Sequence, residues 1–214
     1  MVETAVWHEA ARISHEAAQD KYAQLSKAAT AHEAVAAFHK ELTAQLAGVQ
    51  IKWDKKSHAR VFTELKSVAL IRYLAAKHRL VCFDPAQNAV VNPPLLRRFD
   101  AMDLTTAKGL SIEDPSNEHV AQAARGLDDD NWFMALEGDD DHFLQCGFGT
   151  RAGALPGGFM LEYRDGLDGD HMQAICSDVD DVIAVFTEQL AGSDAWRARF
   201  VWRQLKLTND APST

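Results

Sequence analysis

The chain has 214 residues, of which 47% are hydrophobic and 25% are charged, and both fractions match those of average globular proteins. This composition excludes wholesale disorder, collagen-like repeats and a fibrous architecture, and the net charge of −9 argues against direct binding to phosphate backbones. Three widely spaced cysteines fit neither a disulfide framework nor a zinc knuckle, and no stretch resembles a secretory signal or approaches the about 20 apolar residues of a membrane span. We therefore expect a cytoplasmic protein in a reducing compartment.

Helices are predicted for the first 78 residues, because apolar residues recur at helical spacing and neither glycine nor proline occurs before Gly48. The first expected helix covers residues 3–28. The second begins at a capping box formed by Thr30 and Glu33 and ends at Gly48, and the third begins at a cap at Asp54 or Ser57 and ends at His78. Residues 1–78 would then form an N-terminal helical lobe.

At Arg79 the pattern changes to short apolar runs, and we place the start of a second domain, residues 79–214, at this point. Residues 80–83 and 89–91 are each closed by a proline-containing turn, which predicts two strands around a turn. Residues 95–113 have no assignment. Asp114 and Pro115 then predict the start of a helix.

An antiparallel meander is predicted for the middle of the second domain, since apolar runs alternate with glycine- and aspartate-rich turns. The expected strands cover residues 132–136, 143–146, 159–163 and 171–175. Ser177 would cap a last helix that buries Val182 and Phe186. The predicted fold class is α+β, with the N-terminal helical lobe packed on an antiparallel sheet module that carries a C-terminal amphipathic helix.

The negative charge is concentrated in one segment. Residues 101–190 hold 19 Asp and Glu against 4 Lys and Arg, whereas residues 1–100 hold 10 against 14. Such a field favours a basic partner, although solvated loops that keep the protein soluble would have the same composition. The candidate partner-binding residues are Asp128, Asp129, Asp130, Asp139, Asp140, Asp141, Asp165, Asp168 and Asp170.

Three groups of residues have side chains that could support catalysis or metal binding. His142 and Cys146 lie four residues apart and would share one face, but no third group accompanies them. The aspartates at 165–170 do not have the spacing of an EF-hand loop, and no second carboxylate can be placed opposite Glu162. We therefore expect no enzymatic activity, no metal and no cofactor.

An ordered series of short motifs over residues 114–203 resembles a family of bacterial immunity proteins found beside polymorphic toxins. The series consists of Asp114-Pro115-Ser116, a Leu-Asp-Asp run before the strand at 132–136, Phe143-Leu144-Gln145, the run from Phe159 to Gly166, His171, Val182 to Phe186, and Trp196-Arg197 with Phe200 and Trp202. The resemblance implies a non-catalytic antitoxin that binds one cognate toxin and blocks it. It does not identify the toxin.

The leading hypothesis is thus an immunity protein whose partner is a toxin with a basic surface, without direct binding to nucleic acid or membranes. An adaptor or chaperone-like binding protein is the first alternative, with the N-terminal helices holding the partner. An enzyme that uses His142, Cys146 or Glu162 is the second alternative.

Overall fold

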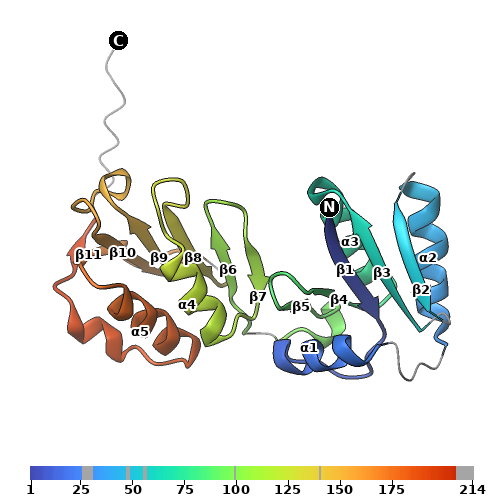
Figure 1. The fold of residues 1–214 in the computed structure, drawn as a ribbon. Helices are drawn as coiled ribbons and strands as arrows, with labels where there is room; N and C mark the ends of the chain where they lie inside the picture. Colours follow the sequence, from blue (N-terminus) through green and yellow to red (C-terminus); the bar gives the residue numbers. More distant parts are fainter. Residues whose placement is uncertain (26–30, 47–48, 55–56, 99, 140, 206–214) are drawn as a thin grey trace, which may run out of the picture. The chain divides into compact units, whose positions relative to one another are not determined.

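The computed structural model describes residues 1–25, 31–46, 49–54, 57–98, 100–139 and 141–205 (Figure 1). The chain divides into two compact units, Met1–Phe99 and Asp100–Thr214. Each unit combines helices with one antiparallel sheet, which confirms the α+β class. No helix within the described residues is long and apolar enough to cross a membrane.

The first unit is built on a five-stranded sheet with the strand order β2-β3-β1-β4-β5. Its strands are β1 (Val2–Trp7), β2 (Gln50–Asp54), β3 (His58–Thr63), β4 (Val81–Asp84) and β5 (Ala89–Val91), and its helices are α1 (His15–Gln24), α2 (Glu33–Gln45) and α3 (Val68–Lys77). Short 3-10 turns occur at Leu65–Ser67 and Pro94–Leu96. All strand pairs are antiparallel.

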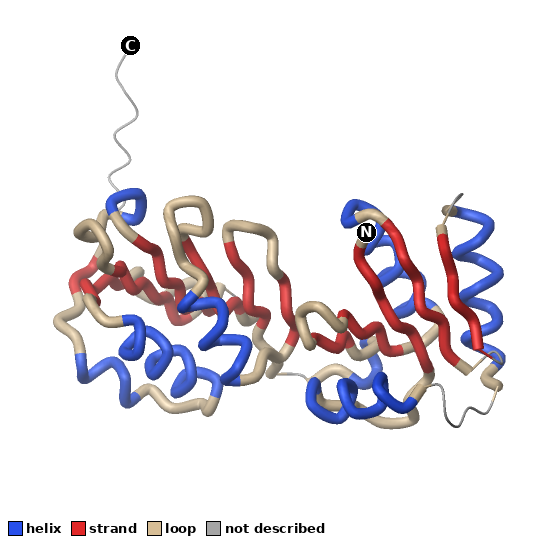
Figure 2. The backbone as a smooth tube through the Cα atoms, in the orientation of Figure 1, coloured by secondary structure: helices blue, strands red, loops and turns tan. Residues whose placement is uncertain are grey.

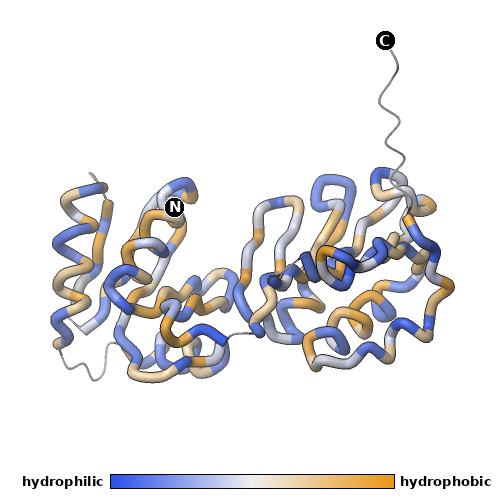
Figure 3. Tube along the Cα trace, turned by 180° about the vertical axis from the view of Figure 1, so that it is seen from behind, coloured by the Kyte–Doolittle hydropathy of each residue, from blue (hydrophilic) through white to orange (hydrophobic). Residues whose placement is uncertain are grey.

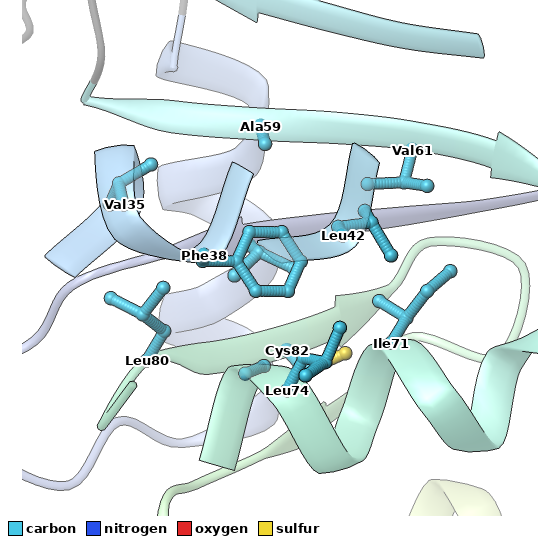
Figure 4. Packing of buried hydrophobic residues seen from close by; sticks show 11 residues of the cluster. Val35, Phe38, Leu42, Ala59, Val61, Ile71, Leu74, Leu80 and Cys82 are labelled. Atoms are coloured by element: carbon cyan, nitrogen blue, oxygen red, sulfur yellow. The ribbon is translucent and has the colours of Figure 1, made fainter. Parts of the chain in front are cut away.

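Both faces of this sheet are covered. Helices α2 and α3 bury Phe38, Leu42 and Leu74 against Val6 and Val61 of the sheet, with the Phe38 ring at the centre of the cluster (Figure 4). On the other face, a second cluster contains Ala18 of α1 together with Trp7, Phe83 and Val90. Because β1 contributes to both clusters, its last four residues are all buried.

The predicted helical lobe is therefore wrong: the first unit is a layered sheet. The first strand contains the β-branched residues Val2, Thr4 and Val6 on one face, and this alternation favours a strand. The apolar spacing from Val6 onward, which predicts a helix, is therefore misleading here. The first helix begins only after Ser14, whose hydroxyl accepts a hydrogen bond from the Ala17 amide at 3.3 Å. The expected third helix likewise contains strand β3 and only then α3.

Helix α2 lies where it was expected, with Phe38 and Leu42 buried, but His32 caps it. The predicted bounds Thr30 and Gly48 lie outside the described residues. The predicted strand pair after Arg79 is confirmed as β4 and β5. This pair belongs to the sheet of the first unit, because β4 pairs with β1, so the contacts divide the chain after Phe99 rather than at Arg79.

The second unit is built on a seven-stranded antiparallel sheet with the order β12-β11-β10-β9-β8-β6-β7 (Figure 2). Its strands are β6 (Asp103–Thr106), β7 (Ser111–Glu113), β8 (Phe133–Glu137), β9 (His142–Phe148), β10 (Phe159–Asp165), β11 (Met172–Cys176) and β12 (Arg203–Gln204), and its helices are α4 (Asn117–Arg125) and α5 (Val179–Leu190). Further 3-10 turns lie at Thr150–Ala152 and Ala195–Arg199. Helix α5 packs on α4 and on β9, β10 and β11.

The four predicted strands of the meander are confirmed as β8 to β11, and the last helix as α5 with Val182 and Phe186 fully buried. The unassigned stretch before Asp114 contains β6 and β7. The helix starts shift by one or two residues, because Ser116 forms a capping box with His119 and Asp178 caps α5.

The two faces of this sheet differ. Side chains alternate along each strand, so Leu144, Cys146 and Leu161 share the buried face with the helices. Hydrophobic and hydrophilic residues are interspersed along the backbone of this unit (Figure 3). Glu162, Gln173 and Ile175 point to the opposite face, where their side chains are half-buried or exposed. Among the described residues, the two α-helices of the second unit do not pack on that face, although the 3-10 turn at Thr150–Ala152 lies against it at Gly147, and we call it the uncovered face.

Candidate partner-binding surface

Two acidic turns meet at one end of the second sheet. The turn between β8 and β9 carries Asp139 and Asp141, and the turn between β10 and β11 carries Asp165, Asp168 and Asp170. These turns are neighbours because Asp165, the last residue of β10, is paired with the first residue of β9. All five side chains are exposed. We call them the acidic end; Asp140, the sixth predicted member, lies outside the described residues.

Arginines hold the second of these turns in shape. The Arg164 guanidinium donates hydrogen bonds to the carbonyl oxygens of Gly169, at 3.2 Å, and of Leu167, and lies 3.6 Å from the Asp141 carboxylate of the other turn. Gly169 is required here, since a Cβ atom would lie 2.5 Å from the Asp165 carbonyl oxygen. Arg164 and Gly169 therefore determine the backbone conformation of this turn.

Arg197 anchors the base of the acidic end. Its two terminal nitrogens lie 2.8 and 2.7 Å from the two carboxylate oxygens of Asp165, and its guanidinium lies over the rings of Tyr163 and Trp196. The Gln204 amide donates a 2.6 Å hydrogen bond to Asp170. In contrast, Asp139 and Asp168 make no ion pair with any other described residue, so their charges face solvent.

The remaining predicted residues, Asp128, Asp129 and Asp130, lie at the opposite end of the sheet. They precede β8, whose far end leads into the turn with Asp139. Asp128 accepts hydrogen bonds from the amides of Asn131 at 2.6 Å and of Asp130 at 2.9 Å, and these bonds, together with Lys108 at 3.4 Å, lower the pKa of its carboxyl group. Asp128 therefore has a local structural role, and the eight described aspartates of the predicted set do not form one surface.

The sequence did not indicate that Glu162 has a partner. The structure places the His171 ring nitrogen Nε2 2.9 Å from the Glu162 carboxylate on the uncovered face, and the Phe143 ring meets the imidazole edge-on at 5.3 Å. Neither carboxylate nor ring is more than about a quarter exposed, at 20% and 22%. The pair is a half-buried hydrogen bond between a carboxyl group and an imidazole. In the sequence, its signal was a histidine shortly after the β10–β11 turn.

His142 and Cys146 do not form a nucleophile–base pair. His142 is exposed at the β8–β9 turn, whereas Cys146 lies beneath the helices with no exposed surface. Burial raises the pKa of the Cys146 thiol well above its ordinary value, and raises that of Cys82 in the first unit to about 12. Among the described residues, no three His, Cys, Asp or Glu side chains gather as metal ligands would.

The first unit has its own charged cluster beside α1. The Tyr22 hydroxyl donates a 2.7 Å hydrogen bond to Glu3 and accepts one of 2.8 Å from Arg60, which also contacts Glu3 directly. Burial raises the pKa of Glu3, but the hydrogen bonds from Arg60 and Tyr22 and the charge of Arg60 lower it by more, so it lies below the ordinary 4.5. The cluster ties α1 to β1 and β3.

This pKa shift predicts acid sensitivity. A carboxyl group with a lowered pKa in the folded state stabilises the fold fully above its unfolded pKa, and this stabilisation is lost as the pH falls through the folded pKa. We expect the free energy of unfolding, measured with urea, to fall between about pH 5 and pH 3, and to fall less steeply in Glu3→Gln. Glu64→Gln, which changes an exposed carboxylate, is the control and should follow the parent; equal slopes in all three proteins would contradict the prediction.

The chain matches no family model, curated protein or solved structure with which it was compared. The fold and the acidic end therefore have to be interpreted from their own geometry, and the resemblance to immunity proteins rests on the sequence motifs alone.

Proposed function

We propose that this protein is a cytoplasmic antitoxin that binds a cognate bacterial toxin and neutralises it by covering a basic surface. The observation that supports this proposal is the convergence of five exposed carboxylates, from two neighbouring turns, at one end of the second sheet. The segment that contains them holds 19 acidic against 4 basic residues. A toxin that acts on an anionic substrate has a basic groove, which such a surface complements.

The structure of the turns favours docking over simple solubility. Arg164 and Arg197 fix the backbone and the Asp165 carboxylate, so part of the acidic end is ordered before a partner arrives. Preorganised side chains lose less conformational entropy on binding than mobile ones. Asp139 and Asp168 then supply charge that is not compensated by any other described residue. Binding of this kind requires neither a metal nor a cofactor.

Charge reversal tests the proposal. The double variant Asp139→Lys/Asp168→Lys is expected to lower the association rate constant for the protein encoded by the neighbouring gene by about tenfold and to weaken its dependence on salt, because steering charges act mainly on association. Stability should change by no more than about 0.5 kcal/mol, as for other exposed loop positions. Stopped-flow binding at two ionic strengths measures the effect.

The matched control is Asp129→Lys/Asp130→Lys, which makes the same change of charge on exposed residues at the other end of the sheet. We expect it to have the smaller effect. Equal slowing by both pairs would mean that the overall field, rather than the acidic end, attracts the partner. An unchanged rate in both variants would rule out the electrostatic docking mechanism.

A further inference from the structure

A pocket of about 430 Å³ lies at the outer edge of the second sheet, and its lining contains none of the residues of the acidic end. Its lining is mainly apolar and includes Met160 and Ile175 of the sheet, Phe200 and Val201 of the segment before β12, and the polar side chains of Gln173 and Arg203. This volume is within the range of pockets that hold a few side chains or a small ligand.

The pocket exists because β12 is short. Only Arg203 and Gln204 pair with β11, opposite Gln173 and Met172. The preceding residue Trp202 donates a 2.8 Å hydrogen bond to the Arg197 carbonyl oxygen and packs its ring on Tyr163, at 4.8 Å between centroids. Since Tyr163 points to the helix-covered face, this anchor holds the segment away from the rest of β11.

The edge of β11 is consequently open at Ile175. The Leu205 amide donates to the His171 carbonyl oxygen at 2.7 Å, so alternate residues, His171, Gln173 and Ile175, turn their backbone groups toward this edge. Val201 would be the next residue in register, but it is in no strand and its side chain is 83% exposed. Among the described residues, no strand therefore pairs with Ile175 on this side, and its side chain is 63% exposed.

The charge at the pocket is positive in an otherwise acidic unit. Arg199 contributes to the lining and is paired with Glu188 of α5. Arg203 is exposed and makes no side-chain hydrogen bond or ion pair with another described residue. With respect to the described part of the chain, the pocket thus offers apolar surface, the available guanidinium of Arg203 and the unpaired backbone groups of Ile175.

We propose that this pocket binds an extended peptide segment of a partner protein that carries an apolar side chain two residues away from a carboxylate. An added residue opposite Ile175 would satisfy its backbone N–H and C=O and place an apolar side chain beside Ile175 and Met160. Because Arg203 already occupies the position opposite Gln173, the segment would leave the sheet there, and its same-face carboxylate would meet the Arg203 guanidinium. A small organic acid could contact Arg203 and the apolar lining of the pocket, but it could not form the backbone hydrogen bonds with both the N–H and the C=O of Ile175. This binding goes beyond the proposed antitoxin function, because it requires an acidic segment, whereas the proposed toxin surface is basic.

Two blocked peptides test this proposal without any toxin. The probe is acetyl-Glu-Thr-Val-Thr-Glu-amide, in which valine and both glutamates share one face in either direction; the comparison peptide has lysine in place of glutamate. In ¹⁵N NMR titrations of the full chain, we expect the acidic peptide to shift the amides of Ile175 and Arg203 with a dissociation constant on the order of 1 mM. The lysine peptide should bind about tenfold more weakly.

Arg203→Glu should reverse the preference between the two peptides, whereas Arg125→Glu, the same charge change on exposed α4, should leave it as in the parent. Equal binding of both peptides, or no saturable shift at about 10 mM peptide, would overturn the proposal. So would binding of hexanoate as tight as that of the acidic peptide, since it would assign the pocket to small acids. A loss of toxin binding in the acidic-end variants, with peptide binding retained, would separate the two proposals.

Discussion

Replacing Phe186 with alanine is expected to lower the free energy of unfolding by about 3 to 5 kcal/mol, the range for truncation of a buried phenylalanine. Phe186 has no exposed surface, and its neighbours Val182 and Val185 on the same face of α5 are equally buried. Since α5 packs on β9, β10 and β11, the lost ring would leave a cavity between the helix and the centre of the sheet. Chemical denaturation followed by circular dichroism measures the change.

Gln122→Ala on the adjacent helix α4 is the control. The Gln122 side chain is exposed and donates a hydrogen bond to Glu118 one turn earlier, so its loss should cost no more than about 0.5 kcal/mol. Normal stability of the Phe186 variant combined with lost partner binding would contradict the assigned orientation of α5 and make Phe186 an interface residue.

The meander of β8 to β11 in the second unit was predictable because its strands are separated by turns with strong local signals. Gly138 and the aspartates after it separate β8 from β9, and the residues 165–170 separate β10 from β11. Strands β1, β2 and β3 of the first unit were not predictable, since Ala, Glu and Lys are frequent around them and favour helices locally, while β1 pairs with β3 and β4 across long sequence separations. Thr4 of β1 pairs with Val61 of β3, a contact that no local pattern reveals.

The candidate surface was predictable in composition but not in arrangement. The aspartates could be found from the sequence, yet their division between the two ends follows from strand direction: Asp130 precedes β8 and Asp139 follows it. The Glu162–His171 pair depends on the register of β10 and β11 and on the path of the turn between them. The pocket depends on the packing of Trp202 on Tyr163. These two aromatic residues are far apart in the sequence, and nothing in the sequence shows that their rings are in contact.

A second large effect is expected at Gly147, the penultimate residue of β9. A Cβ atom at this position would lie 2.4 Å from the Cβ of Ala152, in the 3-10 turn that packs on the strand. The turn is held in place by its own hydrogen bonds, because the amides of Ala152 and Ala154 both donate to the Gly149 carbonyl oxygen at 3.1 Å. Gly147→Ala should therefore cost about 1 to 3 kcal/mol, as overpacking does in other cores, measured as the free energy of unfolding in urea.

A double-mutant cycle identifies the cause. In Gly147→Ala/Ala152→Gly, the nearest of these atoms to the new Cβ is the Cα of residue 152 at 3.6 Å, an ordinary contact. We expect the double variant to regain most of the lost stability, apart from the about 0.5 to 1 kcal/mol that a new glycine costs through its flexibility in the unfolded chain. The interaction energy of the cycle should thus favour the double variant by at least about 1 kcal/mol. If the two single changes instead added independently, the turn at 150–152 would not pack on Gly147 as described, and the uncovered face would be accessible at that point.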